Sequence, residues 1–123
     1  MEAIVVAEDD AVLRHMMQDV LTEFSAWLVC TVGDGLALLE TLTCLVPSLV
    51  VLDVQLPRLD GISAYRRLRE RERTRAVPVL FLTAAPHLVW EAELEGPFEV
   101  LAKPFDLDVL ERRVSHLIGS SAA

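Results

Sequence analysis

The sequence contains no apolar run approaching the roughly 18 residues that a membrane-spanning helix needs, and its 123 residues begin directly on a strand-like segment, AIVVA at 3–7. These features predict a cytoplasmic protein with no membrane partner. Glycine is scarce as well: the five glycines are scattered, which excludes a P-loop and a Rossmann fingerprint. A chain of this length is expected to form one domain with a substantial core.

Cysteine and lysine are both rare. The two cysteines, Cys30 and Cys44, form no CxxC pair and each lies in an apolar run, so we predict buried thiols and no disulfide or metal pair. Lys103 is the only lysine in the chain, whose other ten basic residues are all arginine. This usage suggests that position 103 needs a compact ammonium, for which the planar guanidinium of arginine is no substitute.

Positive charge is in deficit, because the formal net charge is −8. This balance argues against direct binding of nucleic acid. One local exception is the run RRLRERERTR at 66–75, which has six arginines against two glutamates. We interpret it as a solvated helix face.

Segments with the pattern of strands alternate with segments of helical periodicity along the chain. Asp10 stands at an N-cap position, and Met16 and Leu36 are assigned to the apolar stripes of their helices. Five strand–helix units with short links predict an α/β fold: a doubly wound, five-stranded parallel sheet with helices on both faces. For the strand order we adopt 2-1-3-4-5, the order of flavodoxin-like sheets. The expected strands are 3–7, 27–32, 48–53, 77–83 and 98–102; the expected helices are 10–24, 36–42, 62–68 continuing into the basic run, 86–95 and 107–118.

The ends of the predicted strands carry polar groups. In such a sheet, ligands bind beyond the carboxyl ends of the strands, at the point where the strand order reverses. With the order 2-1-3-4-5, this point lies between the first and third strands. We therefore expect Glu8, Asp9 and Asp53 to lie within a few ångströms of one another. The strands deliver, in chain order, Glu8, Asp9 and Asp10; Gly33 and Asp34; Asp53; Thr83; and Lys103.

Three carboxylates at one cleft repel one another and raise their own pKa values unless a cation lies among them. Oxygen-only ligation suits Mg²⁺, which takes one or two carboxylates together with phosphate oxygens. The hydroxyl of Thr83 and the ammonium of Lys103 supply what the oxygens of a phosphoryl group need. The set predicts phosphoryl transfer to a carboxylate, with Mg²⁺ as the cofactor.

Four motifs occur in order and properly spaced: VVAEDD at 5–10, LVVLDVQLPRLDG at 49–61, FLTAA at 81–85 and LAKPF at 101–105. With them the sequence resembles the receiver (response regulator) domain of bacterial two-component signalling over residues 3–118. The resemblance implies a phosphoacceptor signalling domain. It also implies that the domain is not an enzyme acting on other substrates, since it catalyses only its own phosphorylation and dephosphorylation.

The resemblance implies that Asp53 accepts a phosphoryl group from the phosphohistidine of a sensor histidine kinase or a phosphotransfer protein. Glu8 and Asp9 match the metal-binding acid pair, joined by Asp53 and the backbone carbonyl of Gln55. The phosphorylated domain then switches its binding to a downstream protein target or to a fused output domain, and a second copy of the chain is a further candidate partner.

Thr83 matches the switch hydroxyl of the family, and Lys103 matches the phosphate-contacting lysine. Asp10 is interpreted as a helix cap and not as a metal ligand, because it begins the helix. A phosphatase of the haloacid-dehalogenase type also uses an aspartate at a strand end. It requires a second acid two residues later, where this chain has Gln55, and is therefore excluded.

Two departures from the family pattern leave an alternative open. Receivers commonly carry Tyr or Phe three residues before the lysine, where this chain has Val100, and the segment from Thr83 to Gly96 is about two residues shorter than usual. The alternative is a pseudo-receiver, a binding module of the same fold that signals through protein contacts without phosphorylation.

The sequence also predicts the bounds of the domain, the isomer of one peptide bond and one exposed surface. The receiver domain spans residues 1–119 and is followed by a frayed tail at 120–123. The Lys103–Pro104 bond is cis, since an X-Pro bond costs only about 0.5–1 kcal/mol to be cis and the chain must turn sharply there. In the predicted helix 86–95, Trp90 and Leu94 share a solvent-facing side that forms a contact surface for a partner or a second copy.

Overall fold

The computed structural model describes residues 2–23 and 26–122, and within them the chain forms a five-stranded sheet in which all neighbouring strands are parallel. The observed order, β2-β1-β3-β4-β5, confirms the predicted topology. Each strand has five residues: β1 (Ala3–Ala7), β2 (Leu28–Val32), β3 (Leu49–Asp53), β4 (Val79–Thr83) and β5 (Phe98–Ala102).

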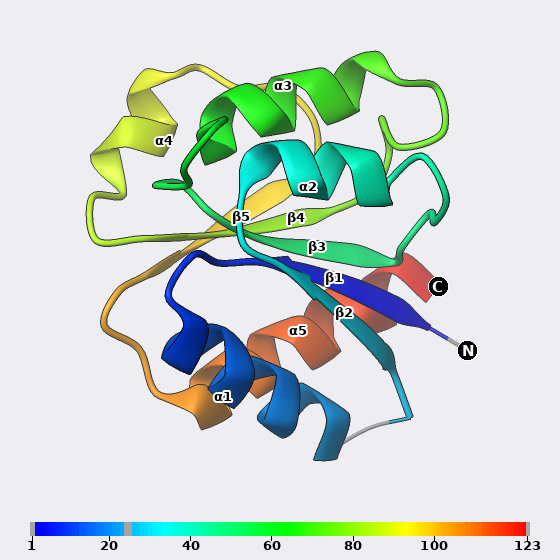
Figure 1. The fold of residues 1–123 in the computed structure, drawn as a ribbon, viewed down its shortest axis with the longest axis vertical. Helices are drawn as coiled ribbons and strands as arrows, with labels where there is room; N and C mark the ends of the chain where they lie inside the picture. Colours follow the sequence, from blue (N-terminus) through cyan, green and yellow to red (C-terminus); the bar gives the residue numbers. More distant parts are fainter. Residues whose placement is uncertain (1, 24–25, 123) are drawn as a thin grey trace.

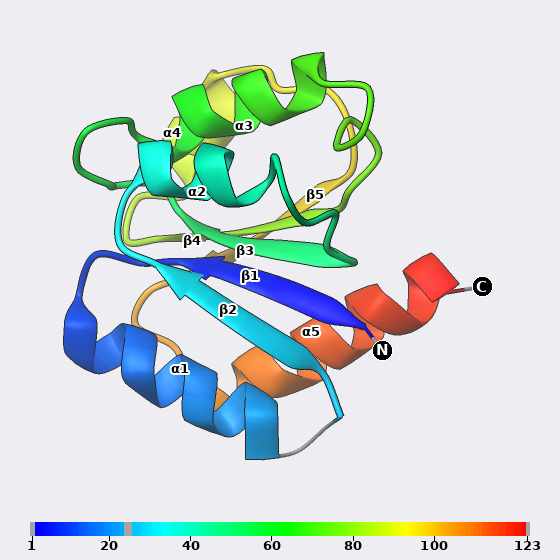
Figure 2. The same cartoon turned by 45° about the vertical axis from the view of Figure 1, so that its right-hand side comes forward.

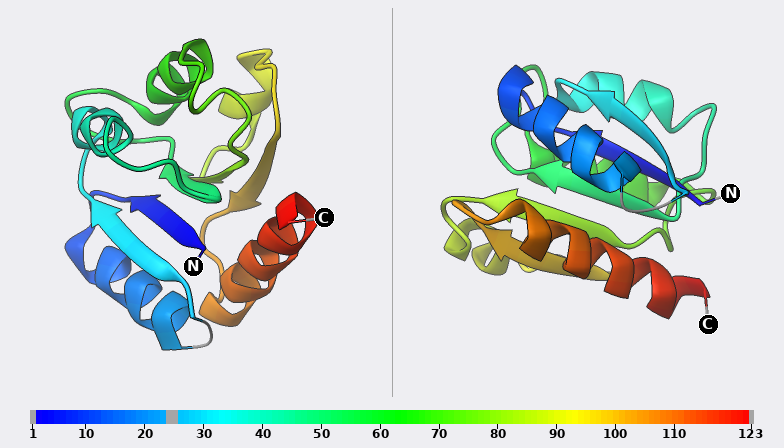
Figure 3. Two further views of the ribbon diagram at one scale, coloured as in Figure 1. Left: turned by 90° about the vertical axis from the view of Figure 1, so that its right-hand side faces the viewer. Right: turned by 90° about the horizontal axis from the view of Figure 1, so that it is seen from below.

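Helices cover both faces of the sheet. In Figures 1 and 2, α1 and α5 lie on one face, and α2, α3 and α4 lie on the other. Figure 3 shows the same three layers from two further directions. The helices are α1 (Ala11–Glu23), α2 (Gly35–Thr41), α3 (Gly61–Glu70), α4 (His87–Glu91) and α5 (Leu107–Ala122).

Two apolar cores fill the spaces between these layers, because successive strand residues point to opposite faces. Val5 and Val50 belong to the core under α2 and α3, whereas Ile4 and Val51 belong to the core against α1 and α5. Every residue of β1, β3 and β4 is buried, as expected for central strands covered on both faces. This double burial holds the carboxyl ends of β1, β3 and β4 in fixed positions.

Several element boundaries differ from the prediction. β2 begins at Leu28 and β4 at Val79, one and two residues later than expected. α4 ends at Glu91 because the chain turns away through two residues with positive φ, Glu93 and Gly96. α5 continues to Ala122; the division into a domain over 1–119 and a tail over 120–123 stays a prediction, and residues 24 and 123 lie outside the described part of the chain.

Three predictions about burial were wrong. Met16 and Leu36 are exposed although they were assigned to apolar stripes, because α1 and α2 each bury a narrower face, centred on Met17 and Leu38. Cys44 is exposed and Cys30 half-buried, both as free thiols. Cys44 lies in the turn that follows α2. In a turn, apolar neighbours along the sequence do not ensure that a residue is buried.

The interpretation of the basic run as a solvated helix face holds for Arg66 and Arg67, which are exposed on α3, and was wrong for Arg69, which is half-buried. α3 ends at Glu70, and the remainder of the run continues through turns. Four arginines of the run donate hydrogen bonds to backbone carbonyls of other segments, and so tie α3 and the following turn to α2 and to the chain around α4 and β5. The bonds run from Arg66 to Ala92, from Arg69 to Thr74, Val77 and Pro97, from Arg71 to Leu39, and from Arg73 to Thr43.

None of the helices in the described part of the chain combines the length and the hydrophobicity that crossing a bilayer requires.

Candidate functional site

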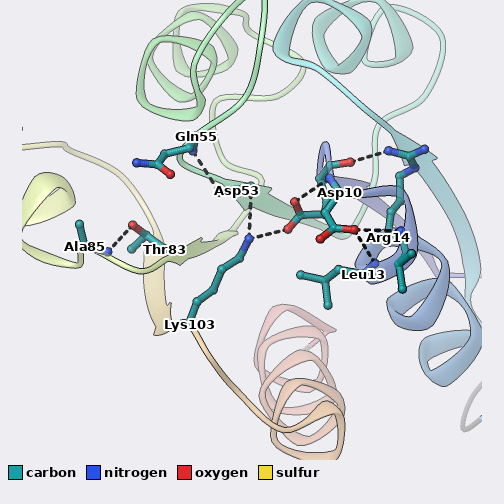
Figure 4. Close-up of polar contacts among 10 residues, drawn as sticks. Asp10, Leu13, Arg14, Asp53, Gln55, Thr83, Ala85 and Lys103 are labelled. Carbon is teal, nitrogen blue, oxygen red and sulfur yellow. Dashed lines mark hydrogen bonds and ion pairs between the residues drawn. The ribbon is translucent and has the colours of Figure 1, made fainter.

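The polar residues predicted at the strand ends meet at one edge of the sheet, because parallel strands present their carboxyl ends together (Figure 4). Glu8 and Asp9 follow β1, and Asp53 ends β3. One carboxylate oxygen from each of these three residues lies within 4.8 Å of the other two. Glu8 and Asp53 are buried, and Asp9 is exposed. The predicted convergence of the three acids is confirmed.

Lys103 lies against two of these acids from the end of β5. Its Nζ donates to Glu8 Oε1 at 2.7 Å and to Asp53 Oδ2 at 2.9 Å (Figure 4). The Lys103 backbone N–H donates to the carbonyl of Thr83 at 2.8 Å, which continues the ladder between β4 and β5. The bond from Lys103 to Pro104 is cis, as predicted. The single lysine of the chain is therefore the cation beside the buried carboxylates.

The charge state of this cluster depends on its burial. Burial raises the pKa of Glu8 to about 7; the hydrogen bond from Lys103 opposes the rise and the neighbouring Asp53 adds to it. Burial alone would lower the pKa of Lys103, but its bonds to Glu8 and Asp53 outweigh that effect and raise it. The single ammonium of Lys103 therefore does not fully offset the burial of Glu8 beside Asp53, and the pKa of Glu8 stays raised.

A divalent cation fits this arrangement. The acids offer three oxygen ligands from two neighbouring strand ends, one of them open to water. Hard oxygen ligands with room for water are what Mg²⁺ takes in proteins, and a cation among the acids would favour the ionised form of Glu8. The donor set therefore suits Mg²⁺.

The segment after β1 is held by several hydrogen bonds. Glu8 Oε2 accepts from the Asp10 N–H at 3.1 Å, and the Glu8 carbonyl accepts from Arg14 Nη1 at 2.8 Å. Asp10 Oδ1 accepts from the N–H groups of Val12 and Leu13 at 3.0 and 3.2 Å. This is the geometry of an N-cap and confirms the interpretation of Asp10. The role of Arg14 was not predicted, since a long-range contact from a helix to a carbonyl leaves no periodic signal.

Asp53 and Thr83 face the same cleft from neighbouring strands. Asp53 Oδ1 accepts from the Gln55 N–H at 3.0 Å, so each carboxylate oxygen of Asp53 has one partner. Thr83 is buried, and its Oγ1 accepts from the Ala85 N–H at 2.9 Å. The hydroxyl hydrogen of Thr83 stays available for donation. That the Gln55 carbonyl binds the metal remains a prediction.

The part of the molecule around α4 differs from the prediction. Trp90 is 59% exposed, as expected, and its ring lies 5.6 Å from that of Phe98. Leu94 packs instead against the core under α2 and α3, so the shared Trp90–Leu94 surface was wrong. The reason is that α4 ends at Glu91 and the positive φ of Glu93 reverses the chain, which turns Leu94 inward.

A family model for the response regulator receiver domain matches residues 4–115, which is most of the chain. The chain belongs to this family. It is a receiver domain of two-component signalling. The pseudo-receiver alternative finds no support in these comparisons.

Relatives of this receiver domain include transcriptional regulators. It is 35% identical over 121 residues to the transcriptional regulatory protein TctD of Salmonella typhimurium, covering 97% of this chain and 53% of TctD. It is 31% identical over 118 residues to the DNA-binding transcriptional regulator NtrC of Escherichia coli, covering 90% and 24%. The chain thus spans about half the length of the first of these relatives, and a quarter of the second.

Solved structures agree with this assignment. The receiver domain of a sensor histidine kinase from Pseudomonas aeruginosa, with a magnesium ion coordinated in its active site cleft, superposes with a TM-score of 0.85 at 30% identity, covering 96% of this chain and 98% of that one. The chemotaxis response regulator CheY4 of Vibrio cholerae gives a TM-score of 0.87 at 23% identity, covering 95% and 98%, and supports the fold alone.

Proposed function

We propose that this receiver domain accepts a phosphoryl group on Asp53, in a Mg²⁺-dependent reaction, from the phosphohistidine of a sensor histidine kinase or a phosphotransfer protein. The supporting observation is the position of Asp53. Asp53 ends β3, which lies between β1, followed by Glu8 and Asp9, and β4, which ends at Thr83; like Glu8, it accepts a hydrogen bond from Lys103. Asp10, by contrast, caps α1 with its carboxylate.

The reaction is a transfer between two nucleophiles. A carboxylate oxygen of Asp53 attacks phosphorus, the bond between phosphorus and the donor histidine nitrogen breaks, and the imidazole leaves with the electron pair. The Lys103 ammonium then pairs with one phosphoryl oxygen, and the Thr83 hydroxyl donates to another. Positioning and fixed positive charge account for most of the catalysis of such transfers.

Four ligands would hold the metal: the carboxylates of Glu8, Asp9 and Asp53 and the backbone carbonyl of Gln55. When bound, Mg²⁺ neutralises the developing charge on the transferred group. Catalysis is confined to the domain's own phosphorylation and dephosphorylation. The domain then acts by changing how it binds a protein target, an attached output domain or a second copy of itself, within the cytoplasm and without direct contact with nucleic acid.

The assignment is tested by intact-mass spectrometry after incubation with acetyl phosphate and Mg²⁺. We expect one added phosphoryl group on the wild-type chain and none on Asp53→Asn. Asp10→Asn is the matched control, because asparagine caps a helix as well as aspartate does, and it should be labelled normally. Full labelling of Asp53→Asn, or labelling that persists in EDTA, would refute the proposal.

A further inference from the structure

The connection from β2 to α2, Gly33-Asp34-Gly35, delivers no group to the acid cluster, yet it contacts both segments that carry proposed metal ligands. Figure 2 shows this cyan connection beside the green loop that leads from β3 to α3. On its other side is the end of β1, since the Glu8 N–H donates to the carbonyl of Val32 at 3.0 Å.

Gly33 makes room for the guanidinium that holds Glu8. Arg14 Nη1 donates to the Glu8 carbonyl at 2.8 Å, and a Cβ at Gly33 would lie only 3.2 Å from that same nitrogen. With Val32 bound to the Glu8 N–H and Arg14 bound to the Glu8 carbonyl, both backbone polar groups of Glu8 are fixed. The peptide that leads into Asp9 is therefore held in place from the side of β2 and α1.

Gly35 makes room for the loop that carries Gln55. A Cβ at Gly35 would lie 2.0 Å from the carbonyl oxygen and 2.8 Å from the Cβ of Leu59, so no other residue fits without moving this loop. The Gly35 N–H also points to the carbonyl of Pro57 at 3.4 Å. The β3–α3 loop thus rests directly on the backbone of Gly35.

Asp34 adds a charged contact to the same loop. Its Oδ1 accepts from the Ala37 N–H at 2.7 Å, which caps α2, and from Arg58 Nη2 at 3.0 Å. The bond from Ala37 and the neighbouring Arg58 lower the pKa of Asp34, so the residue is ionised at neutral pH. Arg58 adopts φ of 64°, a left-handed conformation that is uncommon outside glycine.

We propose that Gly33-Asp34-Gly35 is the positioning element of the metal site: it sets the Mg²⁺ affinity of the domain by holding Glu8–Asp9 and the Gln55 loop, without touching the ion. This rests on the function proposed above. Mg²⁺ demands nearly ideal octahedral geometry with short bonds, so small displacements of either segment weaken binding. Asp53 needs no such support because it lies in a central, buried strand.

The first test measures the Mg²⁺ dissociation constant of the unphosphorylated protein by isothermal titration calorimetry. Gly35→Ala should weaken binding about tenfold, as the loss of outer-shell support does at other metal sites, and Gly33→Ala should weaken it about threefold. Gly119→Ala is the matched control: a Cβ there meets nothing within 4 Å, and its Mg²⁺ affinity should equal that of the wild type.

Arg58→Gly provides a variant that keeps its fold, because glycine adopts positive φ without strain while the ion pair to Asp34 is lost. Arg58→Gly should weaken the binding of Mg²⁺ about threefold. With acetyl phosphate as donor, the half-saturating Mg²⁺ concentration should rise in Arg58→Gly and Gly35→Ala. The rate at saturating Mg²⁺ should stay within about twofold of wild type, since the reacting groups are intact. A rate that stays low at saturating Mg²⁺ would indicate general loss of structure and overturn the proposal.

Asp9→Asn separates this proposal from the proposed function. If Asp9→Asn binds Mg²⁺ as the wild type does, the metal site itself is misassigned and both proposals fail. If Asp9→Asn loses Mg²⁺ while Gly33→Ala, Gly35→Ala and Arg58→Gly bind it normally, the positioning role is overturned and the proposed function stands.

Discussion

The part of the molecule built on β1 and β3 holds its functional groups differently from the part built on α4 and β5. At the first, Glu8 follows and Asp53 ends a buried central strand, and each carboxylate has fixed partners. At the second, α4 has five residues, β5 is an edge strand, and Trp90 is exposed. The acid cluster is therefore fixed by central strands, whereas the region around α4 combines the core contacts of Val89 and Leu94 with hydrogen bonds from side chains of α3.

Those side chains explain how the second region keeps its shape. The Tyr65 hydroxyl donates to the carbonyl of Glu95, Arg66 donates to that of Ala92, and Arg69 donates to that of Pro97. The chain from the end of α4 to the start of β5 is thereby bound to α3. Phosphate acceptance and the shape of the α4 region therefore depend on different contacts, and substitutions should separate them.

The largest effect is expected for Lys103→Arg, which tests the acid cluster of the first region, although the residue itself follows β5. Arginine keeps the charge but replaces a compact ammonium with a planar fork at a position bonded to both Glu8 and Asp53. Loss of a well-placed donor to a developing negative charge typically costs about 10²–10³ in rate. We expect phosphorylation by acetyl phosphate to fall at least about hundredfold, followed by intact mass over time. A rate within threefold of wild type would contradict the assignment of Lys103.

Arg69→Met tests the second region. It removes the donor to the carbonyls of Val77 and Pro97 and the cation over the Tyr65 ring at 4.5 Å. Loss of these hydrogen bonds, one of them to the buried Val77, should lower the free energy of unfolding by about 2 kcal/mol, measured by urea denaturation. Arg67→Met, at an exposed position of the same helix, is the control and should change it by under about 0.5 kcal/mol. If Arg69→Met keeps the wild-type phosphorylation rate, the two regions depend on different contacts. A phosphorylation rate that falls together with stability would contradict this separation.

Asp60→Ala tests the boundary between the regions, where the β3–α3 loop enters α3. Asp60 accepts from the Ser63 N–H at 2.9 Å and from its hydroxyl at 2.8 Å, so removing this cap should cost about 1 kcal/mol at pH 7. Burial alone would raise the pKa of Asp60, but the bonds from Ser63 outweigh it and lower the pKa.

A lowered pKa gives this cap a defined pH dependence. The stabilisation by ionised Asp60 is complete above the unfolded pKa of about 3.9 and is lost as the pH falls through the lower pKa of the folded state. The difference in unfolding free energy between the wild type and Asp60→Asn should therefore stay constant from pH 7 to about pH 5 and change below about pH 4. A difference that varies with pH near neutrality would contradict the assignment.

The smallest effect on stability is expected for Trp90→Ala. Trp90 is 59% exposed and contacts Phe98, and such an aromatic pair contributes about 0.5–1.5 kcal/mol. We expect unfolding to become easier by about 1 kcal/mol or less, with phosphorylation unchanged. Self-association, measured by sedimentation velocity, should weaken if Trp90 is part of a contact surface for a second copy. An unchanged sedimentation coefficient would show that Trp90 is not part of that contact surface.

The two regions also differ in how well their residues predict their structure. In the first region, the strand ends, the Asp10 cap and the convergence of Glu8, Asp9 and Asp53 were all predicted. In the second, the length of α4 and the orientation of Leu94 were predicted incorrectly. The apolar pattern of 86–95 is compatible with a longer helix, and only the backbone turn at Glu93 decides otherwise.

The sequence by itself determined the alternation of strands and helices, the acids, hydroxyl and lysine at the strand ends, and the family. These follow from local periodicity and from residue types that recur at set spacings. Only the tertiary structure decided which arginines bind backbone carbonyls, that Gly33 and Gly35 admit Arg14 and Leu59, and that Cys44 and Met16 face water. These are contacts between segments distant in sequence, and side-chain reach and close packing across layers leave no periodic trace in the chain.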